Sequence, residues 1–295
     1  MHDPFSMPAQ ALLGLLVIGL INGAFYALLS LGLSVIFGLL HVVNFAHGAF
    51  YTAGAFVAYL LLEHAGIGYW GALAAAPLLV GALGVLLERT LLRRLAGLDP
   101  LYGLLLTFGV ALIVQGLLKL QYGSSGLPYP IPAALEGGLE LPFMFLPRYR
   151  AWVIVFSAAT CAATWYVIER TRIGATLRAG TENAALVQAF GVDVPRMTTL
   201  TYGFGVALAA LAGVLAAPIY RVNPMMGADQ VIVVFAVVVI GGMGSIVGSI
   251  ATGYALGLVE AMTKVVYPAA SETVVFVVMA LVLLVRPAGL FGRPE

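Results

Sequence analysis

The chain has 295 residues, of which 62% are apolar and only 9% are charged, and its formal net charge is +1. A soluble globular domain carries about 25% charged residues, so the charge here does not cover a water-facing surface and we expect much of the chain to face lipid. The near-neutral balance lacks the basic stripe of a nucleic-acid binder. The single cysteine, Cys161, excludes an internal disulfide.

Apolar stretches of about 20 residues, the length that crosses a hydrocarbon core, recur along the chain. We place them at 10–39, 46–62, 69–87, 101–120, 151–168, 198–219, 229–264 and 272–286. They lack the alternation of a membrane barrel, and backbone amides in lipid must be paired within their own segment. The sequence therefore predicts an all-α polytopic membrane protein of about eight transmembrane helices, with one domain over 1–295. The first stretch has no basic flank or cleavage site, so we expect it to be retained.

Polar residues interrupt the apolar pattern at 41–50, which contains His41, Asn44, His47 and Gly48. Polar groups at this depth are costly unless they face protein or water. We expect a discontinuous helix here, in which the amide and imidazoles pair with freed backbone groups, and a pore-lining role is compatible with this. The two histidines diverge on a continuous helix and no HExxH motif is present, so no metal site is predicted. An intramembrane enzyme that uses both histidines is a competing hypothesis.

Two polar intervals separate apolar stretches. The interval 121–150 is dense in glycine and proline and forms either a simple connection or an external docking surface. The interval 169–196 contains a short helix signal, for which we expect Thr181 as the cap, Glu182 in the first turn and Gly191 at the end.

The short helix places Leu186, Ala189 and Phe190 on one face. Such a helix either lies on its own subunit or fits a groove on a partner protein.

The stretch 229–264 is too long for one crossing, and glycines interrupt it at 241, 242 and 244. We predict a half-helix, a turn near 240–246 and a second helix. Two interpretations remain open: tight helix packing through the GxxxG spacings of Gly244 with Gly248 and of Gly253 with Gly257, or a broken helix that lines a conduit. Glu260 and Glu272 lie near helix ends, either as pathway groups or reaching the interface.

Basic residues indicate the orientation of the spans. Nine of the fourteen lie on one side if the spans alternate and the broken stretch counts as two crossings: Arg89, Arg93, Arg94, Arg170, Arg172, Arg178, Arg196, Arg286 and Arg293. This predicts a cytoplasmic-membrane protein with the N-terminus outside and the C-terminus inside. No GxxxxGK[ST] motif is present, so this chain does not bind ATP through a Walker loop. The spans also lack the acidic relay expected of a proton-coupled secondary transporter.

Four stretches resemble LivH-type permeases of high-affinity branched-chain amino acid ABC importers. They are GLSVIFGLLHVVNFAHGAFYTAGAF at 32–56, a segment at 173–215 that begins IGATLRAGTENAALVQAFGVDV, VVIGGMGSIVGSIATGYALGLVE at 238–260, and RPAGLFG at 286–292. They keep the family's order, and NFAHG at 44–48 is a strong local signature. The sister LivM type looks different at this first motif.

The resemblance implies an importer complex without a cofactor on this chain. Its partners would be a second permease of the LivM type or similar, two ABC ATPases, a periplasmic solute-binding protein and membrane lipid. The translocation pathway would include Asn44, His47, Gly48, Gly241, Gly242 and Gly244. The ATPase groove would receive the segment from Arg178 to Gly191, with contacts from Leu186, Val187 and Phe190 and polar anchors at Arg178 and Glu182.

The cargo that the resemblance implies is leucine, isoleucine and valine. Permeases for urea and short-chain amides share much of this pattern, so they remain an alternative. An ion-coupled secondary transporter that works alone is a third hypothesis, from another class.

Overall fold

The structure is a computed structural model that describes residues 9–40, 43–95, 97–271 and 273–292. In chain order its elements are α1 (Ala9–Leu40), α2 (Ala46–Ala65), α3 (Tyr69–Thr90), η2 (Leu92–Leu95), α4 (Pro100–Tyr122), η3 (Ala133–Leu135), β1 (Gly138–Leu141), β2 (Met144–Pro147), α5 (Arg148–Arg170), α6 (Arg172–Glu182), α7 (Ala184–Ala189), α8 (Val194–Tyr220), α9 (Met226–Gly241), α10 (Ile246–Val266), η4 (Pro268–Ala270) and α11 (Val274–Val285). The predicted all-α class is confirmed, because a single short hairpin is the only sheet in the described part of the chain.

Six helices of the described chain are long and apolar enough to cross a membrane, and they belong to α1, α3, α4, α5, α8 and α10. The shorter α9 and α11 are also apolar. Each of the eight predicted stretches contains a helix, and 229–264 contains two, α9 and α10. The polytopic membrane architecture and both predicted helix breaks are therefore confirmed.

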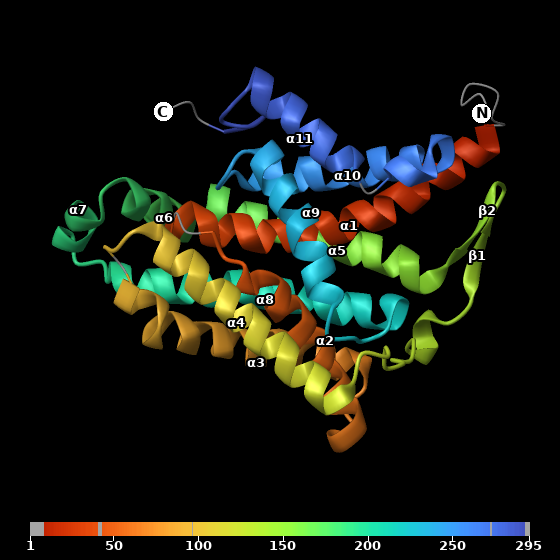
Figure 1. The fold of residues 1–295 in the computed structure, drawn as a ribbon, viewed down its shortest axis with the longest axis horizontal. Helices are drawn as coiled ribbons and strands as arrows, with labels where there is room; N and C mark the ends of the chain where they lie inside the picture. Colours follow the sequence, from red (N-terminus) through yellow and green to blue (C-terminus); the bar gives the residue numbers. More distant parts are fainter. Residues whose placement is uncertain (1–8, 41–42, 96, 272, 293–295) are drawn as a thin grey trace.

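The long helices run side by side along the longest axis of the molecule (Figure 1). The short helices α6 and α7 lie at one end of this axis, and the β1–β2 hairpin lies at the other. Helix α8 is the most deeply buried of the six spans, since it packs on α1, α2 and α3. Helix α1 packs most extensively on α10. Together α1 and α8 form the centre around which the other spans are arranged.

Small residues set the distance between α1 and α10. A Cβ added at Gly257 would lie 2.5 Å from the carbonyl oxygen of Gly19, and one at Gly253 would lie 2.6 Å from the Cα of Ala27. Only glycine permits this approach, and close backbone contact is a main source of helix association in lipid. The packing interpretation of the Gly253–Gly257 spacing is therefore confirmed.

The interval 121–150 contains the β1–β2 hairpin, which the sequence analysis did not predict. Its strands have four residues each, with Gly138 opposite Pro147, and so short a strand shows too little alternation to be recognised. A second pairing joins Leu127 to Val222 through two backbone hydrogen bonds of 2.8 and 2.9 Å. The interval is thereby attached to the connection between α8 and α9.

The interval 169–196 contains two helices, α6 and α7, rather than the single short helix that we predicted. Thr181 belongs to the last turn of α6, where its hydroxyl donates to the carbonyl of Arg178 at 2.7 Å. The cap of α7 is Asn183, whose Oδ1 accepts from the amide of Leu186 at 2.9 Å. The predicted cap at Thr181 and the predicted first-turn position of Glu182 were therefore wrong. The side-chain oxygen of Asn183 caps α7 instead, and Glu182 is the last residue of α6. Gly191 adopts the expected left-handed φ of 83°.

Candidate functional site

The first helix break brings a buried amide to the start of α2. Helix α1 ends at Leu40, α2 begins at Ala46, and α2 starts partway along the long axis rather than at the end where α1 stops (Figure 1). Asn44, in the break, is 1% exposed and donates from Nδ2 to the hydroxyl of Tyr202 at 3.0 Å. Its Oδ1 has no hydrogen-bond partner. The backbone amide of Phe45 donates to Thr107 Oγ1 at 3.2 Å, so α4 and α8 together hold this segment.

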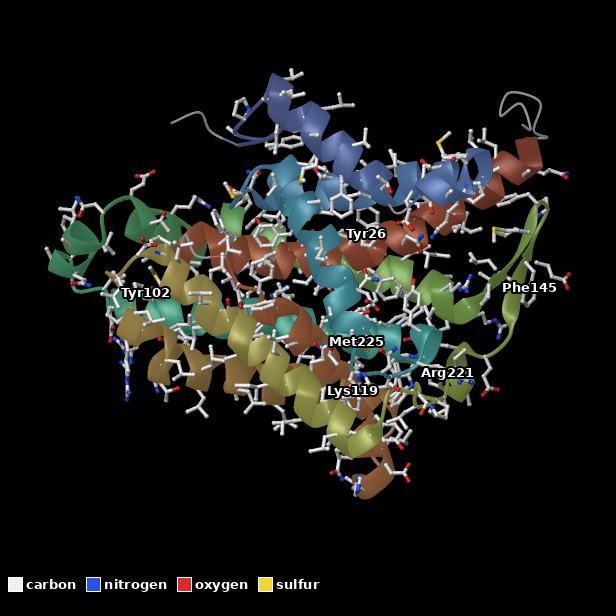
Figure 2. All side chains as sticks on the ribbon, in the orientation of Figure 1. Tyr26, Tyr102, Lys119, Phe145, Arg221 and Met225 are labelled. Atoms are coloured by element: carbon white, nitrogen blue, oxygen red, sulfur yellow. The ribbon has the colours of Figure 1, made fainter. Side chains whose placement is uncertain are left out.

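The first turns of α2 and α9 cross each other at Gly48 and Gly227. A Cβ added to either glycine would collide with the carbonyl group of the other. The connection before α9 turns at Arg221, whose φ is 58°, and Figure 2 shows Arg221 and Met225 on this connection. The structure thus places the beginnings of two short helices against each other.

The sequence analysis missed the role of Gly227. A signal for it exists, because the pattern Val-Asn-x-x-x-Gly-Ala occurs twice, at 43–49 and at 222–228. Asn44 and Asn223 occupy the same place in the two copies. The amide oxygen of Asn223 accepts from the backbone amide of Met225 at 2.9 Å, whereas that of Asn44 is unpaired.

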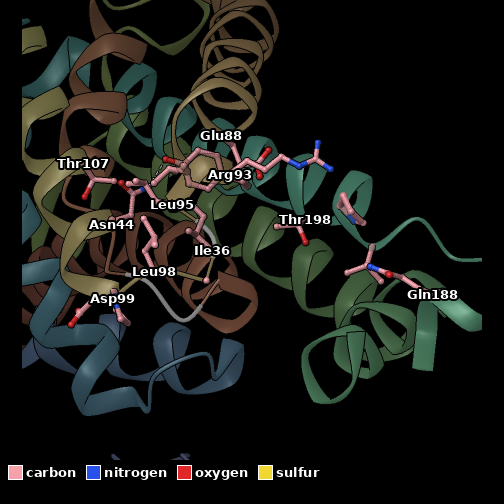
Figure 3. Close-up of a pocket in the computed structure, with 17 residues that line it drawn as sticks. Ile36, Asn44, Glu88, Arg93, Leu95, Leu98, Asp99, Thr107, Gln188 and Thr198 are labelled. Atoms are coloured by element: carbon pink, nitrogen blue, oxygen red, sulfur yellow. Dashed lines mark hydrogen bonds between the residues drawn. The ribbon is translucent and has the colours of Figure 1, made fainter. Parts of the chain in front are cut away.

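Two cavities lie on either side of the start of α2. The larger has a volume of about 410 Å³ and extends from Asn44 to η2 and the beginning of α8 (Figure 3). The smaller, of about 200 Å³, lies between α2, α4 and α9 and reaches Gly48, Gln115 and Gly227.

Adjacent residues divide these two cavities. Asn44 and Thr107 line the larger one, whereas Phe45 and Phe108, the next residue in each case, line the smaller one. The ring of Phe45 stacks on Phe235 at 5.6 Å and meets the edge of Phe108 at 6.0 Å. This aromatic cluster therefore separates the two cavities, both of which lie along α4.

His47 is fully buried between α2 and α1. Its Nε2 lies 2.9 Å from the carbonyl oxygen of Leu29, a group that only accepts, so Nε2 carries the proton. The imidazole holds α2 against α1 and is not among the residues that line either cavity. His41 lies outside the described residues. Within the described ranges no three His, Cys, Asp or Glu side chains gather as metal ligands.

The glycine-rich break is covered by the C-terminal segment. Gly242 and Gly244 have φ values of 100° and 81° between α9 and α10. The amides of Leu290 and Phe291 donate to the last carbonyls of α9, those of Ile240 and Gly241, at 2.8 and 3.1 Å. The 16 residues of α9 separate this turn from the Gly48–Gly227 crossing, so the structure does not bring the two predicted groups of pathway residues together.

The GxxxG spacing of Gly244 and Gly248 does not form one helix seam. Gly244 lies against Gly38 of α1, whereas Gly248 packs on Gly241 in the preceding turn. The positive φ of Gly244 places it in the turn rather than in α10, which explains the difference.

Helix α7 presents an apolar face to the outside. Leu186 is 54% exposed and Phe190 is 80% exposed, as an amphipathic docking helix requires. Val187 is buried in its own subunit, which differs from the predicted groove contact. Arg178 donates to the carbonyl of Ile168 at 2.5 Å and pairs with Glu169 at 3.4 Å. It ties α6 to the end of α5 rather than standing free as an anchor.

Glu260 is buried in a network beside the middle of α1, where Figure 2 labels Tyr26. Its carboxylate accepts from the hydroxyl of Tyr26 at 2.5 Å and pairs with Lys264 at 2.6 Å. This group therefore links α10 to α1 and does not extend freely to the interface. Glu272 lies outside the described residues.

Comparisons with known proteins identify the family of this chain. Residues 15–285 match the family described as the permease component of the branched-chain amino acid transport system. The chain is 31% identical over 300 residues to the permease protein BraD of Pseudomonas aeruginosa, with 95% of each chain covered. It is 31% identical over 292 residues to LivH of Salmonella typhimurium, with 94% of each covered.

A more distant relative, a probable LivH permease of Methanocaldococcus jannaschii, is 27% identical over 286 residues, which cover 90% of this chain and 88% of the relative. No solved structure matches this chain. The family match extends over both helix breaks, the exposed α7 and the helices that enclose the two cavities. The chain therefore belongs to the permease family of branched-chain amino acid transport systems.

Proposed function

We propose that this chain is a permease subunit of an ATP-driven importer that moves branched-chain amino acids across the cytoplasmic membrane. The observation that carries the proposal is the match to relatives named as high-affinity branched-chain amino acid permeases over 94–95% of the chain. The fold supports it, since transporters build solute sites from helices that begin or end inside the membrane. Helices α2 and α9 fit this pattern, since their first turns meet at Gly48 and Gly227 among the packed helices.

Within the pathway, Asn44 and Gly48 line the passage, because each borders one of the two cavities beside the start of α2. His47 and the turn formed by Gly241, Gly242 and Gly244 do not line the passage but position the helices around it. The imidazole fixes α2 on α1, and the turn sets the angle between α9 and α10.

The partners follow from the two ends of the molecule. ATP hydrolysis takes place on two separate ATPase subunits, and α7 docks on one of them through Leu186 and Phe190, with Glu182 and Gly191 at the borders of the contact. Val187 and Arg178 stabilise this segment within the subunit, Val187 through its burial and Arg178 through its hydrogen bond to Ile168. A second permease completes the pore. A secreted binding protein delivers the solute at the end with the hairpin, which faces outside.

The test is uptake by the assembled importer in proteoliposomes. We expect ATP-dependent accumulation of radiolabelled leucine, isoleucine or valine that an ionophore does not abolish. Accumulation of urea or acetamide instead would assign the chain to an amide permease. Uptake that persists without ATP and collapses with the ionophore would identify an ion-coupled transporter and overturn the proposal.

A further inference from the structure

The larger cavity contains a buried carboxylate that has no cationic partner among the described side chains. Glu88, near the end of α3, is 3% exposed, and its Oε2 accepts from the hydroxyl of Thr199 at 2.6 Å. None of the ion pairs within 4.0 Å in the described ranges involves it. A buried carboxylate is costly unless a cation or several hydrogen bonds compensate it. Glu88 is therefore poised to accept a positive group.

A buried acceptor without a hydrogen-bond partner borders the same space. The Oδ1 of Asn44 is buried without a partner, and both Asn44 and Glu88 belong to the cavity lining (Figure 3). An ammonium group donates up to three hydrogen bonds, so it suits a cavity whose lining offers a carboxylate and a free amide oxygen. The two side chains come from α3 and from the α1–α2 break, so they define a site rather than a local turn.

The remaining walls suit an apolar tail. Ile36, Leu92, Leu95 and Leu98 line the cavity, and its volume of about 410 Å³ lies within the range of roughly 300–1,000 Å³ that is typical of small-molecule sites. At the rim, the exposed Arg93 and Asp99 supply one charge of each sign. Arg93 is available to a carboxylate that remains at the mouth.

We propose that this cavity binds the amino acid itself, with Glu88 as the partner of its ammonium group and the leucine-rich walls around its side chain. The identity of the ligand rests on the function proposed above. The cavity lies on the η2 side of the Phe45–Phe108 cluster, which is the cytoplasmic side in our orientation. The cavity is thus the last binding site before the amino acid is released into the cytoplasm. Asn44 contributes its free amide oxygen to the same ammonium group.

The test measures ligand protection of a single cysteine in the complete importer complex in nanodiscs. Thr198 lines the cavity, so Thr198→Cys in a Cys161→Ala background reports its occupancy through the rate of methanethiosulfonate labelling. We expect leucine and 3-methylbutylamine to slow labelling, whereas 4-methylpentanoate, which lacks the ammonium group, does not. Glu88→Gln should raise the leucine concentration for half-protection at least tenfold. Glu88→Asp, which keeps the charge, should raise it less.

Glu63→Gln is the matched control, because Glu63 is an exposed glutamate near the end of α2, outside the cavity lining. It should leave protection unchanged. Equal protection by the amine and the carboxylate, or protection unaffected by Glu88→Gln, would overturn the inference. Normal leucine uptake without any protection would overturn this site alone. Protection by the amine without uptake of branched-chain amino acids would leave the site standing and contradict the proposed function.

Discussion

Asn44 is almost fully buried, yet one of its two amide atoms has no partner. Leaving a buried acceptor unpaired costs about 1–3 kcal/mol, and such a group in a natural protein asks for an explanation. The nearby cavity supplies one, because a ligand that donates a hydrogen bond to Oδ1 recovers part of this cost. At the scale of single residues, Asn44 Oδ1 lacks a hydrogen-bond partner and the Glu88 carboxylate lacks an ion-pair partner within the described ranges.

The crossing of Gly48 and Gly227 gives a prediction at the same scale. Gly227→Ala should destabilise the protein by about 1–3 kcal/mol, the usual cost of overpacking, because the new Cβ meets the carbonyl group of Gly48. The midpoint of thermal unfolding in detergent measures the effect.

The control for that prediction is Gly116→Ala in α4. No atom lies within 4 Å of a Cβ built at Gly116, and alanine is the better helix former by roughly 1 kcal/mol. Its unfolding midpoint should therefore equal or exceed that of the wild type. Similar midpoints for the two variants would show that α2 and α9 do not cross at this point.

At the scale of elements, α1 and α10 are joined by small residues and by two polar contacts, Tyr26 with Glu260 and Ser30 with Ser249. Tyr26→Phe removes the hydroxyl that donates to the carboxylate of Glu260. A hydrogen bond to a charged group contributes about 1.5–3 kcal/mol, so the unfolding midpoint should fall. Tyr102→Phe, at an exposed tyrosine in α4, should leave the midpoint unchanged. An unchanged midpoint for Tyr26→Phe would mean that the network does not hold the two helices together.

Helix α7 buries Val187 in its own subunit and exposes the apolar side chains of Leu186 and Phe190. An exposed apolar helix face of this kind is typical of helices that bind in a groove. Phe190→Asp should therefore abolish ATP-dependent uptake while the amount of protein in the membrane stays normal, since a charge buried in the groove costs several kcal/mol. Uptake and quantitative immunoblots of the same vesicles measure both quantities.

Ala184→Asp is the control for α7, because it adds the same charge at the exposed first residue of the helix. A negative group there is favourable to the helix dipole, so uptake should be retained. Wild-type uptake by Phe190→Asp would exclude α7 from the contact with the ATPase.

The whole molecule is asymmetric in charge and structure. Four arginines, Arg170, Arg172, Arg178 and Arg196, lie in α6 or at the adjoining ends of α5 and α8. The hairpin occupies the opposite end of the molecule from α6 and α7 (Figure 1). Because positive residues are retained on the cytoplasmic side, the α7 end should face inward.

Cysteine labelling in intact cells tests this orientation. In a Cys161→Ala background we expect Phe145→Cys, at an exposed site in β2, to react with an impermeant maleimide from outside. Ala185→Cys in α7, also exposed, should react only after the membrane is opened. The reverse pattern would invert the topology and remove α7 from any cytoplasmic partner.

The apolar spans, the two helix breaks and the membership of a permease family could be predicted from the sequence, because each depends on a local feature. A span requires about 20 apolar residues, and a break requires glycine or polar residues within them. The common face of Leu186 and Phe190 was predicted for the same reason, since helical spacing places them together, whereas its exposure was not. The division of 169–196 into two helices was not, because the cap at Asn183 competes with an equally suitable Thr181.

Tertiary structure alone decided which of these features meet. Glu88 precedes Arg89 at the end of a span, a position from which a carboxylate commonly reaches water. Only the packing of α8 on α3 brings the hydroxyl of Thr199, 111 residues away, to its carboxylate and buries the side chain. The glycine turn is likewise covered by a tail that follows the last span. Hydropathy follows from the solvent around each segment, whereas a cavity forms where distant helices fail to fill the space between them, and no single segment contains that information.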